Sequence, residues 1–166
     1  MEEITIVEIP DMRVLGIQRK GSYRLIPDLL LTVYRYAIKN GAVITGPPLF
    51  LCHETSPEAV KEANEMGTAH VEVVWPVSGD VKGSGEILAY SIPGGKMVHT
   101  VHRGPYETCE PTYLRLFSWI AEHGLAICGP IREMYPNNPH WVPREEIITE
   151  IFVPVDEGIP LSGSER

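Results

Sequence analysis

The chain has 166 residues, of which 43% are hydrophobic and 22% are charged, and its formal net charge is −8. These values are typical of one globular domain with a proper hydrophobic core. The acidic balance argues against a phosphate backbone or an anionic membrane surface as the main partner, because both require clustered Lys and Arg. It is compatible with a cationic ligand.

Cysteine usage and the N-terminal residues indicate the compartment. The three cysteines are an odd number without CxxC spacing, which favours free thiols in a reducing, cytoplasmic environment. The first residues lack the basic segment and the long apolar run of a signal peptide. No apolar stretch approaches the ~20 residues that are needed to span a bilayer.

The first half of the chain predicts strands and helices with clear boundaries. Residues rich in β-branched side chains precede Pro10, and apolar positions at helical spacing precede Asn40 and Gly41, which are typical of a helix end. Ser56 and Pro57 are typical of a helix start. We expect strands over 3–9, 12–20, 49–53 and 69–77, and helices over 25–39 and 56–66.

The second half predicts the same order after a linker over 78–85, which is rich in Gly and Ser. Pro111 fits the first turn of a helix, and Gly124 ends it. Residues 157–166 are expected to be a disordered tail. We expect strands near 86–92, 96–103, 129–136 and 146–155, a helix over 110–122 and a loop over 136–144.

The two halves repeat each other at a constant spacing. Ile9-Pro10, Gly21-Ser22-Tyr23, Gly41 and Gly46-Pro47 recur 83 residues later (92 − 9 = 83), and the segment that begins at Glu72 recurs at Glu150. We therefore predict an α+β fold built from a pseudo-twofold tandem repeat, about 3–77 and 86–155, of a strand-strand-helix-strand-strand unit. Its antiparallel sheets join or face each other, with the helices on one side and a ligand cleft between the repeats.

The second half also carries the motifs of a known family. They are the turn His102-Arg103-Gly104-Pro105-Tyr106-Glu107, a helix with Leu116, Trp119, Ile120, Gly124 and Leu125, then Gly129-Pro130, Glu133, Tyr135 and a final Thr149-Glu150 with Pro154-Val155. Together they resemble the GyrI-like small-molecule-binding domain, the effector-binding domain of AraC-type regulators. The resemblance covers about 3–155, so we predict a single domain over 1–156.

The resemblance implies several properties. It implies a tandem strand-helix-strand-strand repeat with a ligand pocket at the junction of the repeats. Members bind planar, often cationic, amphipathic molecules, some resemble enzymes that hydrolyse reactive cyclopropane-bearing toxins, and others bind gyrase. The motifs begin at the start of this chain with no helix-turn-helix before them, which predicts a standalone protein without direct nucleic-acid contact.

A duplicated scaffold should carry its chemistry where the two copies differ. Glu133 and Tyr135 stand where the first copy has Phe50 and Cys52, and a spacing of two places both on one face of a strand. A carboxylate beside an aromatic ring can hold a cation. A buried carboxylate would also have a raised pKa, which suits proton transfer. The alternative is an edge strand with Glu133 in water.

Other aromatic and acidic residues are candidates for the ligand site. Tyr106 could line the cleft or stabilise a turn as Tyr23 does, and Trp119 and Trp75 could line it or pack in the core. Trp141, in a loop, could close over a ligand. Glu150 is a secondary candidate, because its match to Glu72 favours a structural role. The predicted ligand-binding set is Glu133, Tyr135, Tyr106, Trp119, Trp75, Trp141 and Glu150.

The sequence favours neither a metal site nor a cofactor. His99 and His102 are three apart on a predicted strand, so they face opposite sides, and no pair of His or Cys has ligand spacing. No phosphate loop or nucleotide fingerprint occurs. Cys109 near a helix start could have a lowered pKa, but no base accompanies it.

Three functions remain open from the sequence. The first is a binding protein for amphipathic aromatic or cationic molecules, with Glu133 as the charge anchor. The second is a hydrolase of reactive electrophiles, in which Glu133 is a general acid or base acting through water and Tyr135 is a hydrogen-bond donor. The third is a protein inhibitor, such as one that binds gyrase. The oligomeric state is left open.

Overall fold

A computed structural model of the protein describes residues 2–157. The predicted tail beyond Glu157 lies outside these residues. Among them, no helix is long and apolar enough to cross a membrane. The elements are β1 (Thr5–Ile9), β2 (Met12–Gly21), α1 (Ile26–Lys39), β3 (Val43–Ile44), β4 (Leu49–Cys52), α2 (Pro57–Met66), β5 (Ala69–Ser78), β6 (Leu88–Ile92), β7 (Gly95–Arg103), α3 (Glu110–Glu122), β8 (Leu125–Ile127), β9 (Ile131–Met134) and β10 (Ile148–Glu157).

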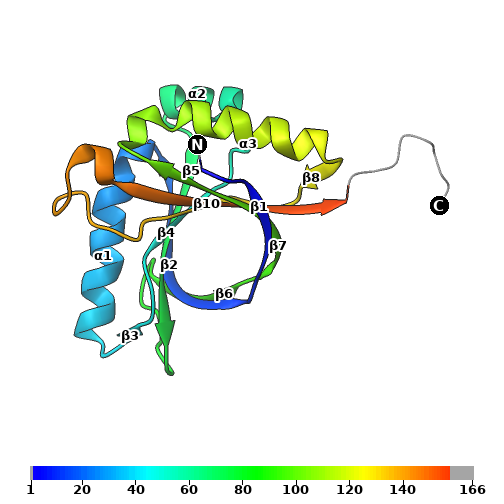
Figure 1. The fold of residues 1–166 in the computed structure, drawn as a ribbon. Helices are drawn as coiled ribbons and strands as arrows, with labels where there is room; N and C mark the ends of the chain where they lie inside the picture. The colour runs from blue at the N-terminus through cyan, green and yellow to red at the C-terminus, as the bar shows by residue number, and fades with distance from the viewer. Residues whose placement is uncertain (1, 158–166) are drawn as a thin grey trace.

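All strands join one antiparallel sheet, so the α+β prediction is confirmed. The order is β1-β7-β10-β9-β4-β5-β2-β6, with β3 paired to β5 and β8 paired to β10. The halves therefore join edge to edge through β4 and β9 rather than facing each other as two sheets. The sheet curls into an incomplete ring, and the helices lie outside it (Figure 1).

The long strands of the two halves correspond in pairs: β1 to β6, β2 to β7, β4 to β9 and β5 to β10. If each strand is replaced by its counterpart, the order read from the β6 edge is the same as the order read from the β1 edge. β1 pairs with β7, and its counterpart β6 pairs with β2, so each half donates its first strand to the other half. β4 pairs with its own counterpart β9 at the centre. The pairing pattern is thus symmetric about β4 and β9. That the symmetry arose by duplication stays a prediction.

The main core lies between the helices and one face of the sheet. Val33 of α1, Ala63 of α2 and Leu116 of α3 join one buried cluster with side chains of β2, β5 and β10. Hydrophobic burial of this kind is the main term that holds helices on a sheet. A smaller cluster, with Val14, Leu49, Leu51, Val74 and Ile92, lies on the other face of the sheet, inside the curl.

Helix ends follow the expected chemistry. The Ser56 side chain accepts a hydrogen bond from the Ala59 N–H and caps α2, while Gly67 ends α2 in the left-handed conformation at φ 67°. Pro at the first turn of all three helices costs no hydrogen bond there. The structure differs from the prediction in adding the two- and three-residue strands β3 and β8, and in extending β10 to Glu157.

Candidate ligand-binding site

The two halves meet at the pair Phe50 and Glu133. These residues lie opposite each other in the register of β4 and β9. They are also equivalent positions, 83 residues apart, so the symmetry of the sheet is centred on them. Phe50 belongs to the main core, and cross-strand partners point to the same face. Glu133 therefore points from the centre of the sheet toward the helices.

Two tyrosine hydroxyls hold the Glu133 carboxylate. The Tyr135 hydroxyl donates a hydrogen bond to Oε1 of Glu133 at 2.9 Å, and the Tyr113 hydroxyl of α3 donates to Oε2. Both oxygens thus have a donor. The prediction that Glu133 and Tyr135 act together is consistent with this contact, and Glu133 is half-buried rather than in open water.

Burial raises the pKa of Glu133, and the two tyrosine hydrogen bonds and the nearby His102 offset part of that rise. The pKa values of Tyr113 and Tyr135 are raised well above the ordinary tyrosine value, first by burial and then by the Glu133 charge. Both hydroxyls are therefore protonated donors at neutral pH. The arrangement supplies one ionisable acid in an otherwise neutral, aromatic setting.

Aromatic rings flank the pair on both sides. The Tyr106 ring meets the Tyr135 ring edge-on at 5.5 Å, and the Tyr23 ring meets the Phe50 ring edge-on at 5.8 Å. Tyr23 and Tyr106 are equivalent positions in the two halves. Tyr106 is 41% exposed, so its face is accessible to a ligand. Edge-to-face packing of this kind stabilises aromatic walls beyond the burial of their area.

An apolar groove lies beside this cluster. It has a volume of about 350 Å³ and runs between residues 55–57, at the start of α2, and the α3–β8 region. Phe117 lines the groove, and its ring lies 5.9 Å from the ring of Tyr113, one helical turn away. Ile120, Leu125 and Ile127 complete the α3–β8 wall. The groove therefore provides apolar surface between parts of the two halves, and Phe117 and Tyr113 connect it to the Glu133 carboxylate.

His102 fixes the turn that carries Tyr106. This buried residue contacts Thr112 Oγ1 of α3 at 3.0 Å through Nδ1 and the Pro105 carbonyl at 3.0 Å through Nε2. Gly104 has φ 117°, a conformation that favours glycine. The turn motif that starts at His102 therefore has a structural role, because it holds Tyr106 against Tyr135.

The tryptophans and Glu150 lie away from Glu133. Trp75 packs on Tyr34 and donates from Nε1 to the Leu30 carbonyl at 2.9 Å, so it attaches α1 to β5. Trp119 is half-buried and stacks on His123 with ring centroids 3.7 Å apart. Trp141 is 83% exposed in its loop. None of the three has a contact with Glu133 among the interactions of residues 2–157.

Glu150 lies on the opposite face of the sheet. Its neighbour Ile151 is paired with Glu133 in register and belongs to the main core, so Glu150 points inside the curl. There its Oε1 accepts a hydrogen bond from His99 Nε2 at 2.9 Å. His99 and His102 do face opposite sides of β7, as the sequence predicted. Glu150 and Glu133 are therefore not brought together.

Cys109 does not have the lowered pKa that its position at a helix start suggested. Burial raises the pKa of its thiol to about 12, with a further contribution from the Glu133 charge. A thiol with this pKa is protonated at neutral pH and is a poor nucleophile. The structure thus removes the basis for a nucleophilic role.

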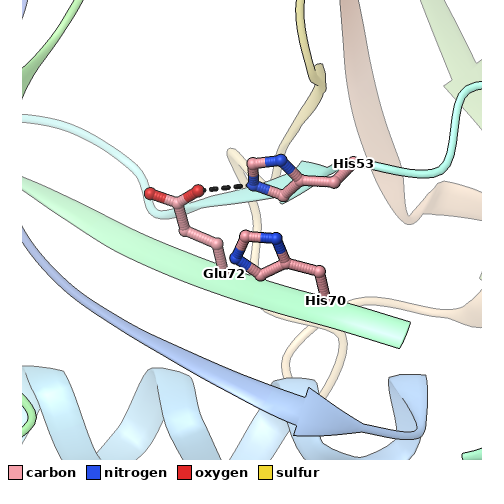
Figure 2. Close-up of side chains that lie close together, drawn as sticks. All are labelled: His53, His70 and Glu72. Carbon is pink, nitrogen blue, oxygen red and sulfur yellow. Dashed lines mark hydrogen bonds and ion pairs between the residues drawn. The ribbon is translucent and has the colours of Figure 1, made fainter. Parts of the chain in front are cut away.

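Sequence reasoning missed two groups of residues. The first is Tyr113, because a tyrosine at core spacing in a helix gives no sign that its hydroxyl reaches a carboxylate. The second is a polar cluster of His53, His70 and Glu72, in which His53 directly follows β4 and the other two lie on β5 (Figure 2). Only the strand register, which sequence spacing does not reveal, brings it together.

Comparison with known proteins gives the family. The sequence profile of the GyrI-like small molecule binding domain matches residues 2–156. The chain belongs to the GyrI-like family. A comparison with curated protein sequences gives no significant match.

Solved structures share this GyrI-like fold. The EcmrR C-terminal domain has a TM-score of 0.83 and 22% identity, over 95% of this chain and 99% of that domain. The present chain spans only 58% of the EcmrR chain seen in a complex with DNA. A hydrolase from Listeria innocua has a TM-score of 0.69 and 15% identity, over 93% of this chain and 92% of that chain.

A more distant GyrI-like neighbour was solved with a ligand. SAV2435 bound to tetraphenylphosphonium has a TM-score of 0.56 and 15% identity, over 93% of this chain and 94% of that chain. At these identities the similarity concerns the fold alone. Membership of the family makes this chain a small-molecule-binding domain.

Proposed function

We propose that this domain binds amphipathic, aromatic cations at the junction of β4 and β9, with Glu133 as the charge anchor. The observation that carries the proposal is a half-buried carboxylate held by two tyrosine hydroxyls at the centre of the sheet. Such a group is costly to bury ionised unless a positive charge accompanies it. A cationic ligand would supply that charge.

The surroundings of Glu133 fit an aromatic cation better than a small inorganic ion. Tyr135 and Tyr106 offer aromatic rings near the carboxylate, and Phe117, whose ring lies 5.9 Å from that of Tyr113, adds apolar surface in the groove. Cations bind over aromatic rings, and a desolvated contact of this kind contributes about 2 kcal/mol. The tetraphenylphosphonium complex of SAV2435 makes that cation the natural first probe.

The test is calorimetric titration of the purified protein with tetraphenylphosphonium at pH 8. Glu133→Gln keeps the side-chain shape and removes the charge, so we expect at least a tenfold loss of affinity, which corresponds to about 1.4 kcal/mol. Glu150→Gln is the matched control, because this carboxylate lies on the other face of the sheet. It should bind as the wild type does.

Two outcomes would contradict the proposal. One is equal affinity in the wild type and Glu133→Gln, and the other is loss in Glu150→Gln alone. The hydrolase and gyrase-binding hypotheses stay predictions of the sequence. On this proposal, the protein functions by binding a ligand.

A further inference from the structure

We propose that His53, His70 and Glu72 form a binding site for a divalent late transition metal, with Zn²⁺ as the representative ion. One ligand atom from each residue lies within 4.8 Å of the other two. Imidazole nitrogen and carboxylate oxygen are ligands that Zn²⁺, Ni²⁺ and Co²⁺ share. The site is distinct from the Glu133 cluster, because it lies on the inner face of the sheet.

Strand geometry places the three residues. β4 pairs with β5 so that Cys52 lies opposite Val71, the last pair of the register, and the rings of the next residues, His53 and His70, stack on each other. His70 and Glu72 are two apart on β5, so both project from the same face. The two imidazole rings lie one over the other at 3.8 Å and 9°, with the Glu72 carboxylate beside them (Figure 2).

The donor spacing is close to what a tetrahedral ion requires. Ligands at about 2.0–2.2 Å from Zn²⁺ lie roughly 3.4 Å from one another. The contact between His53 Nε2 and Glu72 Oε1 is 2.7 Å, already inside this distance. The ligand atom of His70 lies within 4.8 Å of the other two, so the His70 ring has to rotate out of the stack to reach a shared ion. Three protein ligands leave a fourth position open to water or another ligand.

Neighbouring groups hold the carboxylate in place. The Tyr90 hydroxyl donates to Glu72 Oε2 at 2.6 Å, which leaves Oε1 directed to His53. Such outer contacts orient ligands in metal sites. Metal binding would replace the contact of His70 Nε2 with Gln18 Oε1. The buried Arg132 cation interacts with Glu72 and opposes a second positive charge, so we expect micromolar rather than nanomolar affinity.

The fold itself does not require the two histidines. The equivalent positions in the second half are Pro136 and Ile148, beside Glu150, the counterpart of Glu72. That half keeps a single His–Glu pair, His99 and Glu150, with a similar contact of 2.9 Å. The triad is therefore a property of the first half alone. The second half supplies a control in the same molecule.

The test is calorimetric titration of the full-length protein, cleared of metal with a chelator, with ZnCl₂. We expect one ion per chain, and at least a tenfold loss of affinity in both His53→Ala and His70→Ala. His99→Ala removes a histidine of the same kind of pair and should bind Zn²⁺ as the wild type does. Circular dichroism of each variant checks that the fold is retained.

The proposal is overturned if the wild type takes up no Zn²⁺ at 0.1 mM, roughly a hundredfold above a micromolar dissociation constant. It is also overturned if folded His53→Ala and His70→Ala bind as the wild type does, because the ion would then lie elsewhere. As a second readout, Co²⁺ in place of Zn²⁺ should give an absorption spectrum of low-symmetry coordination that His70→Ala lacks.

Discussion

On the proposed function, Glu133 serves the ligand at a cost to the stability of the free protein. Glu133 is half-buried, and burial raises the pKa of its carboxyl above the ordinary value of 4.5. Residues that serve a ligand are often destabilising in the free protein, because they are optimised for the complex. The aromatic and tyrosine contacts around Glu133 reduce this cost without removing it.

The stability of the free protein should therefore depend on pH through Glu133. A pKa raised on folding means that the folded state holds this proton more tightly than the unfolded state. The resulting stabilisation is complete below about pH 4.5 and is lost as the pH rises through the folded-state pKa. Glu133→Gln cannot titrate, so it should gain stability relative to the wild type between pH 4.5 and pH 8.

Urea unfolding of both proteins at pH 4.5 and pH 8 measures this difference. We expect the free energy of unfolding of Glu133→Gln, minus that of the wild type, to be larger at pH 8 than at pH 4.5. A difference for Glu133→Gln that is the same at both pH values would contradict the assignment of a raised pKa.

At the scale of elements, two turns close the curl of the sheet. The turn between β1 and β2 contains Asp11, whose Oδ1 accepts a hydrogen bond from the Gly94 N–H at 2.6 Å in the turn between β6 and β7. Asp11 and Gly94 are equivalent positions, so this contact is a second point on the symmetry axis. The close approach depends on glycine.

Gly94→Ala should destabilise the protein strongly. A Cβ at this position would lie 2.0 Å from the Ile9 carbonyl oxygen, a backbone atom that cannot move without shifting β1. We expect a loss of about 3 kcal/mol, the upper end of overpacking costs. Gly46→Ala is the control, because its Cβ would make an ordinary contact at 3.7 Å. Urea unfolding measures the stability of both variants. Equal stabilities of Gly94→Ala and Gly46→Ala would contradict the close approach of the backbone at Gly94.

The order of the strands and helices along the chain could be predicted from the sequence, whereas the pairing of the strands in the sheet could not. Pro, Gly and the hydrophobic periodicity predicted every long strand and helix, because these signals are local, and the 83-residue repeat related the two halves. The exchange of β1 and β6 between halves depends on long-range pairing, which leaves no local pattern. The same limit applies to the candidate site: Glu133 and Tyr135 are two apart in the sequence and could be predicted as a pair, whereas the contacts of Tyr113 and of the pair His53–His70 required the structure.

At the scale of the whole molecule, residues that match between the halves serve the fold. On the proposed function, the ligand site lies where the halves differ. Matched residues such as Gly41 and Gly124 end equivalent helices, and Tyr23 and Tyr106 flank the centre on both sides. At the centre itself one copy has Phe50 and the other Glu133. A symmetric sheet with an asymmetric central pair offers one charged anchor per chain, so we expect one ligand per chain.

The most direct measurement is a crystal structure of the protein with bound tetraphenylphosphonium. We predict one cation per chain on the helix side of the sheet, with a phenyl ring against Tyr106 or Tyr135 and the positive centre within about 6 Å of an aromatic ring. The Glu133 carboxylate should be its nearest acidic group. A cation bound inside the curl near Glu150, with the Glu133 cluster unchanged, would contradict the account.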